Sequence, residues 1–241
     1  QRRQTLKAAA GWIALGGWSA ASAQQRSNVI ELIGDVLLNG ARLLAGQSGL
    51  RHLPEAFTEG LAAKVGAMVP SLAEDPLAGF NPDAAVPIKE QKKMDRFILF
   101  AVAAAKEALL QANWAPETAE QQERTATIIA SGIGGFPAIV DAVRTTDERG
   151  PRRLSPFTIP SFLVNMAAGH VSINFGFKGP LGAPVTACAA GVQAIGDAAR
   201  LIRCGEADID ICGGAEATID RVSLGGFAAA RALSSAYDDY P

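Results

Sequence analysis

Short strand-like runs alternate with helical segments along most of this chain, and this alternation constrains its fold more than any other feature. The runs "TATIIA" (125–130) and "ADIDICGGAE" (207–216) have the length and apolar content of buried strands. A third run, "APVTA" (183–187), is predicted as a strand that ends directly at Cys188. Helices are predicted at residues 90–112, 136–146, 160–176 and 189–203. The pattern indicates an α/β fold, a sheet with helices on its faces.

Composition narrows the classes of function. The 241 residues are 49% hydrophobic, enough for one sizeable core. The net charge of −2 argues against a chain-wide nucleic-acid-binding surface, which needs a strongly basic face. Three cysteines, an odd and sparse number, argue against a disulfide framework. We expect no metal site, because there is no CxxC pair and the two histidines, His52 and His170, are far apart in the sequence.

Cys188 lies in "PVTACAAGVQAIG" (184–196), between a predicted strand and a predicted helix. Small neighbours let a substrate carbonyl approach and let backbone N–H groups point at an oxyanion. The partial positive charge of a helix N-terminus favours the thiolate, the form of cysteine that attacks a thioester. The alternative is a buried, inert cysteine, a common fate of this residue type and our interpretation of Cys204 and Cys212.

The N-terminus has a different character. "RRQTLK" (2–7), a short apolar run and "ASAQ" (21–24) predict a twin-arginine export signal over residues 1–23. The alternative is a short buried helix. The apolar run is too short to predict a membrane-spanning helix. Residues 24–42 form a second, foreign-looking segment. With "NG" at 39–40 it predicts a β-hairpin, and it resembles the start of the periplasmic domain of iron-dicitrate-type regulatory proteins.

Residues 43–241 resemble the N-terminal half of β-ketoacyl-acyl carrier protein synthases of the type II, dissociated class. The resemblance rests on "VTACAAG" together with six further segments in the family's order. These are "LLAGQSG", "KEQKKMDRF", "SGIGG", "GPRRLSPFTIPSFLVNMAAGHVSINFGFKGP", "DAARLIRCGEADIDICGGAEA" and "GGFAAARALS".

The resemblance implies a thiolase-like layered α-β-α-β-α fold, of which this chain holds the first half. It implies a condensing acyltransferase of fatty acid elongation: acyl transfer from acyl carrier protein to a cysteine, then decarboxylative condensation with malonyl-acyl carrier protein. The implied partners are the acyl- and malonyl-loaded carrier protein and a second copy of the chain, paired through residues 182–187. We expect no cofactor, no nucleic acid and no membrane as partner. The synthase portion is expected to be cytoplasmic, in conflict with the export-like N-terminus.

The resemblance also assigns residues. Cys188 matches the nucleophile, and its own N–H would supply half of an oxyanion hole. Ile133, in "SGIGG", matches the residue that lines the acyl pocket and limits chain length. His170 matches a structural position, so we interpret it as a partly buried histidine and not a base. Six basic residues match the mouth of the pocket, where they would attract the acidic carrier protein: Lys89, Lys92, Lys93, Arg152, Arg153 and Arg231.

Two departures from the family pattern stand out. The family's first strand is replaced by the export-like segment, and its catalytic histidines and lysine have no counterpart in the chain. We therefore expect the chain as written to be an incomplete fragment that does not catalyse condensation. The alternatives are a polyketide-type ketosynthase and an exported regulatory-domain chimera, the latter supported only by residues 1–49. A non-catalytic chain-length factor is a further class, and Cys188 argues against it.

Overall fold

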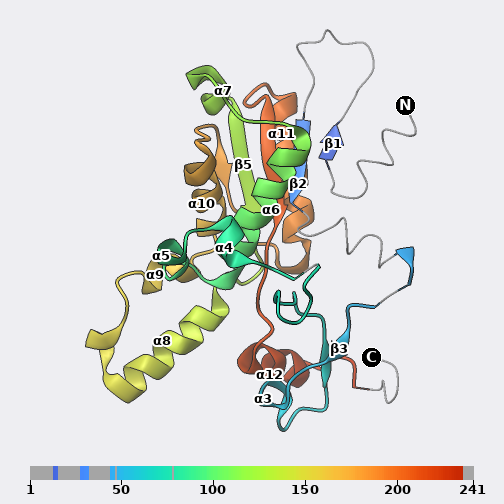
Figure 1. Cartoon of the computed structure of the whole chain (residues 1–241), viewed down its shortest axis with the longest axis vertical. Helices are drawn as coiled ribbons and strands as arrows, with labels where there is room; N and C mark the ends of the chain where they lie inside the picture. Colours follow the sequence, from blue (N-terminus) through green and yellow to red (C-terminus); the bar gives the residue numbers. More distant parts are fainter. Residues whose placement is uncertain (1–12, 16–27, 33–43, 47, 78, 236–241) are drawn as a thin grey trace.

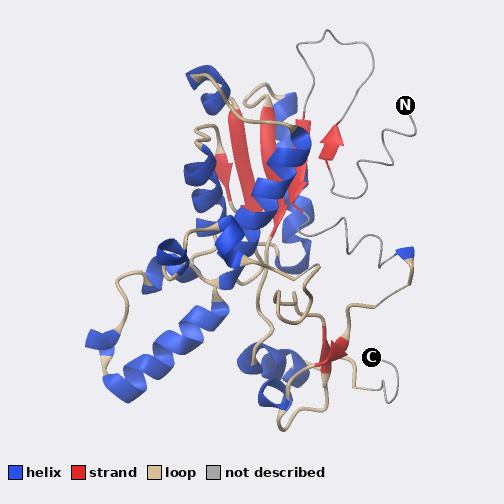
Figure 2. Ribbon diagram, viewed as in Figure 1, coloured by secondary structure: helices blue, strands red, loops and turns tan. Residues whose placement is uncertain are grey.

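The computed structural model describes residues 13–15, 28–32, 44–46, 48–77 and 79–235. Within them, a five-stranded sheet has the order β1-β2-β7-β5-β6. The strands are β1 (Ile13–Leu15), β2 (Asn28–Leu32), β5 (Thr125–Ala130), β6 (Leu181–Gly182) and β7 (Ile209–Gly214). β1 pairs antiparallel with β2, and the other neighbours pair parallel (Figure 2). The α/β fold class is confirmed.

The two central strands are buried on both faces. All six residues of β5 are buried, as are the first five of β7. Because successive side chains of a strand point to opposite faces, Ile129 and Ile211 pack into one core cluster, and Ile128 and Cys212 into the other. Such continuous apolar runs are typical of parallel strands covered by helices on both sides.

Three long helices cover the sheet. α6 (Arg96–Ala112) and α10 (Met166–Phe175) share a core cluster with one face, and α11 (Ala190–Arg203) packs on the other (Figure 1). The prediction of one helix over 90–112 is wrong at its start. The chain turns between α5 (Ile88–Gln91) and α6, because the Asp95 carboxylate accepts a hydrogen bond from the Phe97 N–H and caps a new helix there.

The remaining elements lie around this layered body. The predicted helix at 160–176 is confirmed as two helices, α9 (Thr158–Phe162) and α10. Helix α8 (Phe136–Arg149) has no buried residue and projects away from the sheet (Figure 1). The others are β3 (Arg51–His52), α3 (Glu55–Thr58), β4 (Val65–Gly66), α4 (Pro82–Ala85), α7 (Ala119–Glu123), the 3₁₀ turns η3 (Pro151–Arg153) and η4 (Ala187–Ala189), and α12 (Arg221–Ala229).

The strand predicted at 183–187 is wrong. The structure has only the two-residue β6 in this region, and it ends at Gly182, before the predicted strand. Two features stop the strand: Pro184 has no N–H to donate to a ladder, and Ala187 has a φ of 50°, outside the β region. The pairing of residues 182–187 with a second copy, which was expected through a continuous strand, stays a prediction.

The N-terminal segments contribute to the sheet. β2 falls within the segment expected to be foreign, residues 24–42, and pairs with β7. The sheet therefore has a strand beside β7, although the family's own first strand was expected to be replaced. β1 falls within the predicted export signal. The "NG" turn at 39–40 and most of the signal lie outside the described residues. Of the helices that the structure describes, none has the length and apolar character needed to cross a membrane.

Candidate active site

Cys188 lies in the tight turn η4, immediately before α11, and its side chain is exposed. The turn begins with Ala187 in a left-handed conformation, which is uncommon for a residue other than glycine and recurs at functional sites. The Ala189 N–H donates to the Thr186 carbonyl at 3.1 Å, and the Thr186 hydroxyl donates to Gln193 Oε1 at 2.7 Å. The turn is thus tied to the first turns of α11. The thiol is therefore accessible, as a nucleophile must be, and the role of Cys188 stays a prediction.

The small residues around the cysteine have two separate roles. Ala187 and Ala189 are exposed and leave the thiol accessible. Ala190 is buried, and Gly191 meets β7 at Gly214. A Cβ on Gly214 would lie 3.1 Å from the Gly191 Cα, so only small residues allow this approach. The sequence interpretation assigned all four small neighbours to substrate access, whereas the last two of them seat the helix on the sheet.

The "SGIGG" loop follows β5 and lies beside the cysteine turn. A Cβ on Gly132 would stand 3.4 Å from the Ala187 carbonyl oxygen, which puts the two loops in contact. Gly134 has a φ of 74°, and a Cβ on Gly135 would come 2.6 Å from the Phe162 Cα, so both positions require glycine. Ile133 at the tip is 38% exposed and therefore available to a ligand.

Sequence reasoning missed Glu216. This residue follows β7, and its carboxylate accepts hydrogen bonds from Ser131, Gly132 and Ile133. A signal was present, because the carboxyl ends of neighbouring parallel strands meet at one edge of a sheet, and the segments after β5 and β7 are such neighbours.

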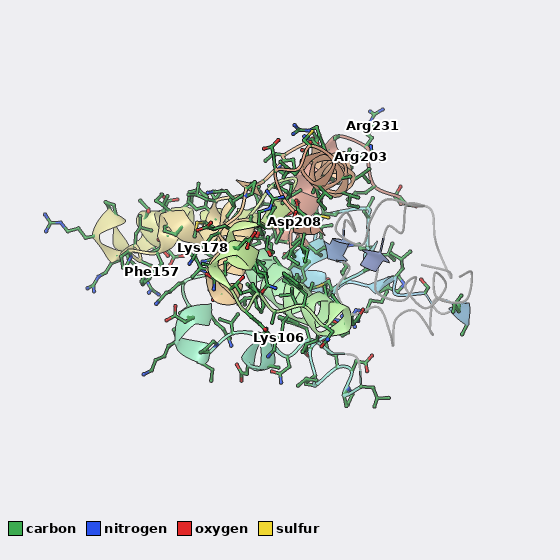
Figure 3. The ribbon with its side chains drawn as sticks, turned by 90° about the horizontal axis from the view of Figure 1, so that it is seen from above. Lys106, Phe157, Lys178, Arg203, Asp208 and Arg231 are labelled. Atoms are coloured by element: carbon green, nitrogen blue, oxygen red, sulfur yellow. The ribbon has the colours of Figure 1, made fainter. Side chains whose placement is uncertain are left out.

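The six basic residues do not form one group. Lys92 and Arg153 line one surface cavity of about 490 Å³, together with Asp95, Arg96 and Asp141. Figure 3 shows Arg231, which follows α12, on the opposite side of the molecule from Phe157, which lines the same cavity. The other three are placed as follows: Lys89 is exposed on α5, Arg152 is exposed in η3, and Lys93 Nζ pairs with Glu90 at 2.7 Å and lies 5.2 Å from the Phe157 ring centre.

His170 lies on α10 and is partly buried. Burial lowers its pKa, an effect that the nearby Glu90 opposes and Lys93 adds to. It therefore stays neutral at physiological pH. Among the residues that the structure describes, no group of three or more histidine, cysteine and acidic side chains could hold a metal ion.

Comparison with known proteins adds to this geometry. Residues 38–240 match the family model "Beta-ketoacyl synthase, N-terminal domain". Over 201 residues the chain is 48% identical to 3-oxoacyl-[acyl-carrier-protein] synthase 2 of Rhizobium meliloti, covering 83% of this chain and 48% of the relative. A crystal structure of a beta-ketoacyl synthase from Burkholderia phymatum superposes with a TM-score of 0.69 and 28% identity, covering 83% of this chain and 47% of that one.

A more distant structure supports the fold alone. It is a type II polyketide ketosynthase in complex with its acyl-carrier protein, with a TM-score of 0.57 and 22% identity, covering 62% of this chain and 43% of that chain. The expected fold class, the first half of a thiolase-like layered architecture, is confirmed by these likenesses. The chain spans about half the length of the curated relative that it matches at 48% identity.

Proposed function

This chain belongs to the beta-ketoacyl synthase family, and on that premise we propose that Cys188 accepts an acyl group from acyl carrier protein in the elongation of fatty acids. The observation that carries the proposal is the exposed thiol in a left-handed turn at the start of α11. The named relatives that support fatty acid elongation are 3-oxoacyl-[acyl-carrier-protein] synthases.

The chemistry is a thioester exchange. The Cys188 thiolate attacks the acyl carbonyl carbon, and the new S–C bond forms as the carbonyl oxygen takes up negative charge. The Cys188 N–H, at the start of the helix, is a donor for that oxyanion. The intermediate collapses by breaking the bond to the carrier's sulfur, which leaves as a thiol once protonated. In the family's second reaction, which we do not expect from the chain as written, malonyl-acyl carrier protein loses carbon dioxide, and the resulting carbanion attacks the acyl carbonyl carbon and releases the Cys188 thiolate.

The test of the proposal is acylation of the chain. The purified protein is incubated with acyl-loaded carrier protein and then digested, and peptides are examined by mass spectrometry. The expected result is an acyl mass on the peptide that contains Cys188, removed by hydroxylamine as a thioester is. An acyl mass found only on other peptides, or on none, would contradict the proposal.

Polyketide synthesis is the second candidate, since ketosynthases of that class share the fold. Fatty acid elongation is favoured, because the polyketide likeness is only 22% identical whereas the fatty acid relative is 48% identical. The two are separated by which acyl groups reach Cys188: simple saturated chains in one case, polyketo chains in the other.

Ile133 sets the length of the accepted chain, in our proposal. Its loop contacts the cysteine turn, and its side chain is partly exposed. Ile133→Phe should slow acylation of Cys188 by long chains about tenfold or more while acetyl and butyryl transfer stay within about twofold, because overfilling a packed slot is costly. Acylation rates across chain lengths measure this. An equal loss at all lengths would contradict the role.

The cavity lined by Lys92 and Arg153 is the proposed contact for the acidic carrier protein. Lys92→Glu should raise the dissociation constant for carrier protein about fivefold to tenfold at low salt, with the difference shrinking near 0.5 M salt, because exposed charges are screened. The control is Lys178→Glu. Lys178 is exposed and its N–H donates to Gln122 beside α7, far along the sheet from α9 (Figure 1). Equal weakening by both variants would contradict the site.

Self-association of the chain stays a prediction. An exposed apolar side chain that follows the edge strand β6 supports it: Val185 is 54% exposed. The export signal over 1–23 and the cytoplasmic location of the synthase portion also stay predictions.

A further inference from the structure

The Glu216 carboxylate joins two loops that are far apart in the sequence. Its Oε2 atom accepts hydrogen bonds from the Gly132 N–H at 2.8 Å and from the Ile133 N–H at 3.1 Å. Its Oε1 atom accepts a hydrogen bond from the Ser131 hydroxyl at 3.1 Å. Three donors of the "SGIGG" loop therefore converge on one carboxylate from the segment after β7. Bonds to an ionised acceptor are shorter and stronger than neutral ones, and successive N–H groups are a recurrent anion-binding arrangement.

Ser131 extends the contact across the loop. While its hydroxyl donates to Glu216, its oxygen accepts a hydrogen bond from the Gly134 N–H at 3.0 Å. Ser131 is buried, so these bonds are the main replacement for water at its hydroxyl. The carboxylate thus organises the loop from its first residue to its fourth.

The loop is also pressed against the cysteine turn at the point where Glu216 binds it. A Cβ on Gly132 would be 3.1 Å from Glu216 Oε2 and 3.4 Å from the Ala187 carbonyl oxygen. Gly132 is therefore close both to the carboxylate and to the residue that precedes Cys188. Any movement of the loop away from Glu216 changes the contact that supports Ala187, whose left-handed conformation shapes the turn.

We propose that Glu216 is a positioning residue that holds the "SGIGG" loop against the cysteine turn, and so sets where Ile133 and Cys188 stand relative to each other. Its significance for acyl transfer rests on the proposed function. The loop geometry that Glu216 maintains can be measured without any acyl substrate. The positioning role of Glu216 can therefore be disproved while the acylation of Cys188 holds, and the reverse is also true.

The experiment compares Glu216→Ala with Glu216→Gln in the 241-residue chain. Amide hydrogen exchange is followed by NMR at Gly132 and Ile133, which should exchange at least about tenfold faster in Glu216→Ala because their acceptor is gone. Glu216→Gln keeps an amide oxygen that both N–H groups can reach, so its exchange should stay within about threefold of the parent. The matched control is Glu120→Ala: Glu120 is an exposed glutamate of α7, which precedes β5, whereas the loop follows β5.

A second readout separates positioning from general loosening. Iodoacetamide labels the exposed Cys188 and Cys204. Peptide mapping gives the rate of labelling at each, and the measured quantity is the Cys188 rate divided by the Cys204 rate. In Glu216→Ala the ratio should fall by about threefold or more and be restored in Glu216→Gln, because only the cysteine turn depends on the loop. If Glu216→Ala does not fold, Ser131→Ala removes one hydrogen bond to the Glu216 carboxylate and should raise exchange at Gly132 and Ile133 by a smaller factor. Unchanged protection of the loop amides in Glu216→Ala, or equal acceleration in Glu120→Ala, would overturn the proposal.

Discussion

Replacing Cys188 with alanine is expected to abolish thioester formation on this chain, lowering acyl incorporation by at least about 100-fold. The thiolate is the attacking group, and an alanine has no atom that can replace it. Because the side chain is exposed, its removal should change the free energy of unfolding by no more than about 0.5 kcal/mol. Incorporation is measured with radiolabelled acyl-carrier protein, and stability by urea denaturation.

The chain supplies its own controls for this experiment. Cys204 is also exposed but follows the last turn of α11, at the other end of the helix from Cys188. Cys204→Ala should acylate at the rate of the parent. Persistent labelling of Cys188→Ala would show that the acyl group goes elsewhere, and loss of labelling in Cys204→Ala would show that the wrong cysteine was identified.

The second large expected effect is on the free energy of unfolding, and it concerns Asp210. It lies in β7 between Ile209 and Ile211, fully buried, on the strand face that carries Cys212 toward α11. Neither of its carboxyl oxygens has a hydrogen-bond partner among the described residues. Burial raises the pKa of Asp210 to about 8, and the nearby Ile128 N–H opposes this only weakly. The folded chain therefore keeps a neutral carboxylic acid at pH 7.

The direction of the pH dependence follows from proton binding. Between the ordinary pKa of an aspartate, 3.8, and the folded-state pKa of about 8, the folded chain holds a proton that the unfolded chain has released. The Asp210 contribution to the free energy of unfolding is greatest below the lower pKa. It falls as pH rises through this window, by about 1.4 kcal/mol per pH unit at most, and is lost above the upper pKa.

Asp210→Val should therefore stabilise the chain, by about 2–4 kcal/mol near pH 7, because it removes a buried group without partners and adds a good strand former. The gain should grow from about pH 5 to about pH 8, which urea denaturation at several pH values measures. The control is Asp208→Asn, since Arg124 binds the Asp208 carboxylate at 2.6 Å and lowers its pKa. That variant should not be more stable at any pH. A loss of stability in Asp210→Val would contradict the account of Asp210.

Two parts of the candidate site were proposed from local sequence. Cys188 was proposed from its small neighbours and the helix that follows it, and its role stays a prediction; the glycine turn at 131–135 was predicted from its composition. Both depend on residues next to one another in the chain. Glu216 was missed because its partners are more than 80 residues away in the sequence, and the position of Glu216 after a predicted parallel strand was not used. The basic residues were grouped by resemblance, but Arg231 follows α12, which places it on another side of the molecule.

The sequence by itself determined which segments are buried strands and helices. The run "TATIIA" is short and rich in β-branched residues, which favours a buried strand, and the body of α11 is long enough for a helix, so β5, β7 and α11 appear where the pattern predicts them. The ends of elements were less determined. Asp95 starts α6 later than the apolar pattern suggests, and Pro184 with Ala187 prevents a strand before Cys188.

Only the tertiary structure decided which segments, distant in the sequence, contact one another. The parallel order β2-β7-β5 brings the loops after β5 and β7 to one edge, where Glu216 reaches the "SGIGG" loop and the loop touches Ala187. The same packing puts Asp210 between two layers, where no described residue is a hydrogen-bond partner of its carboxyl group. Hydrophobic periodicity cannot encode these contacts, because it specifies which face of an element is buried, whereas a hydrogen bond depends on the register between elements distant in the chain.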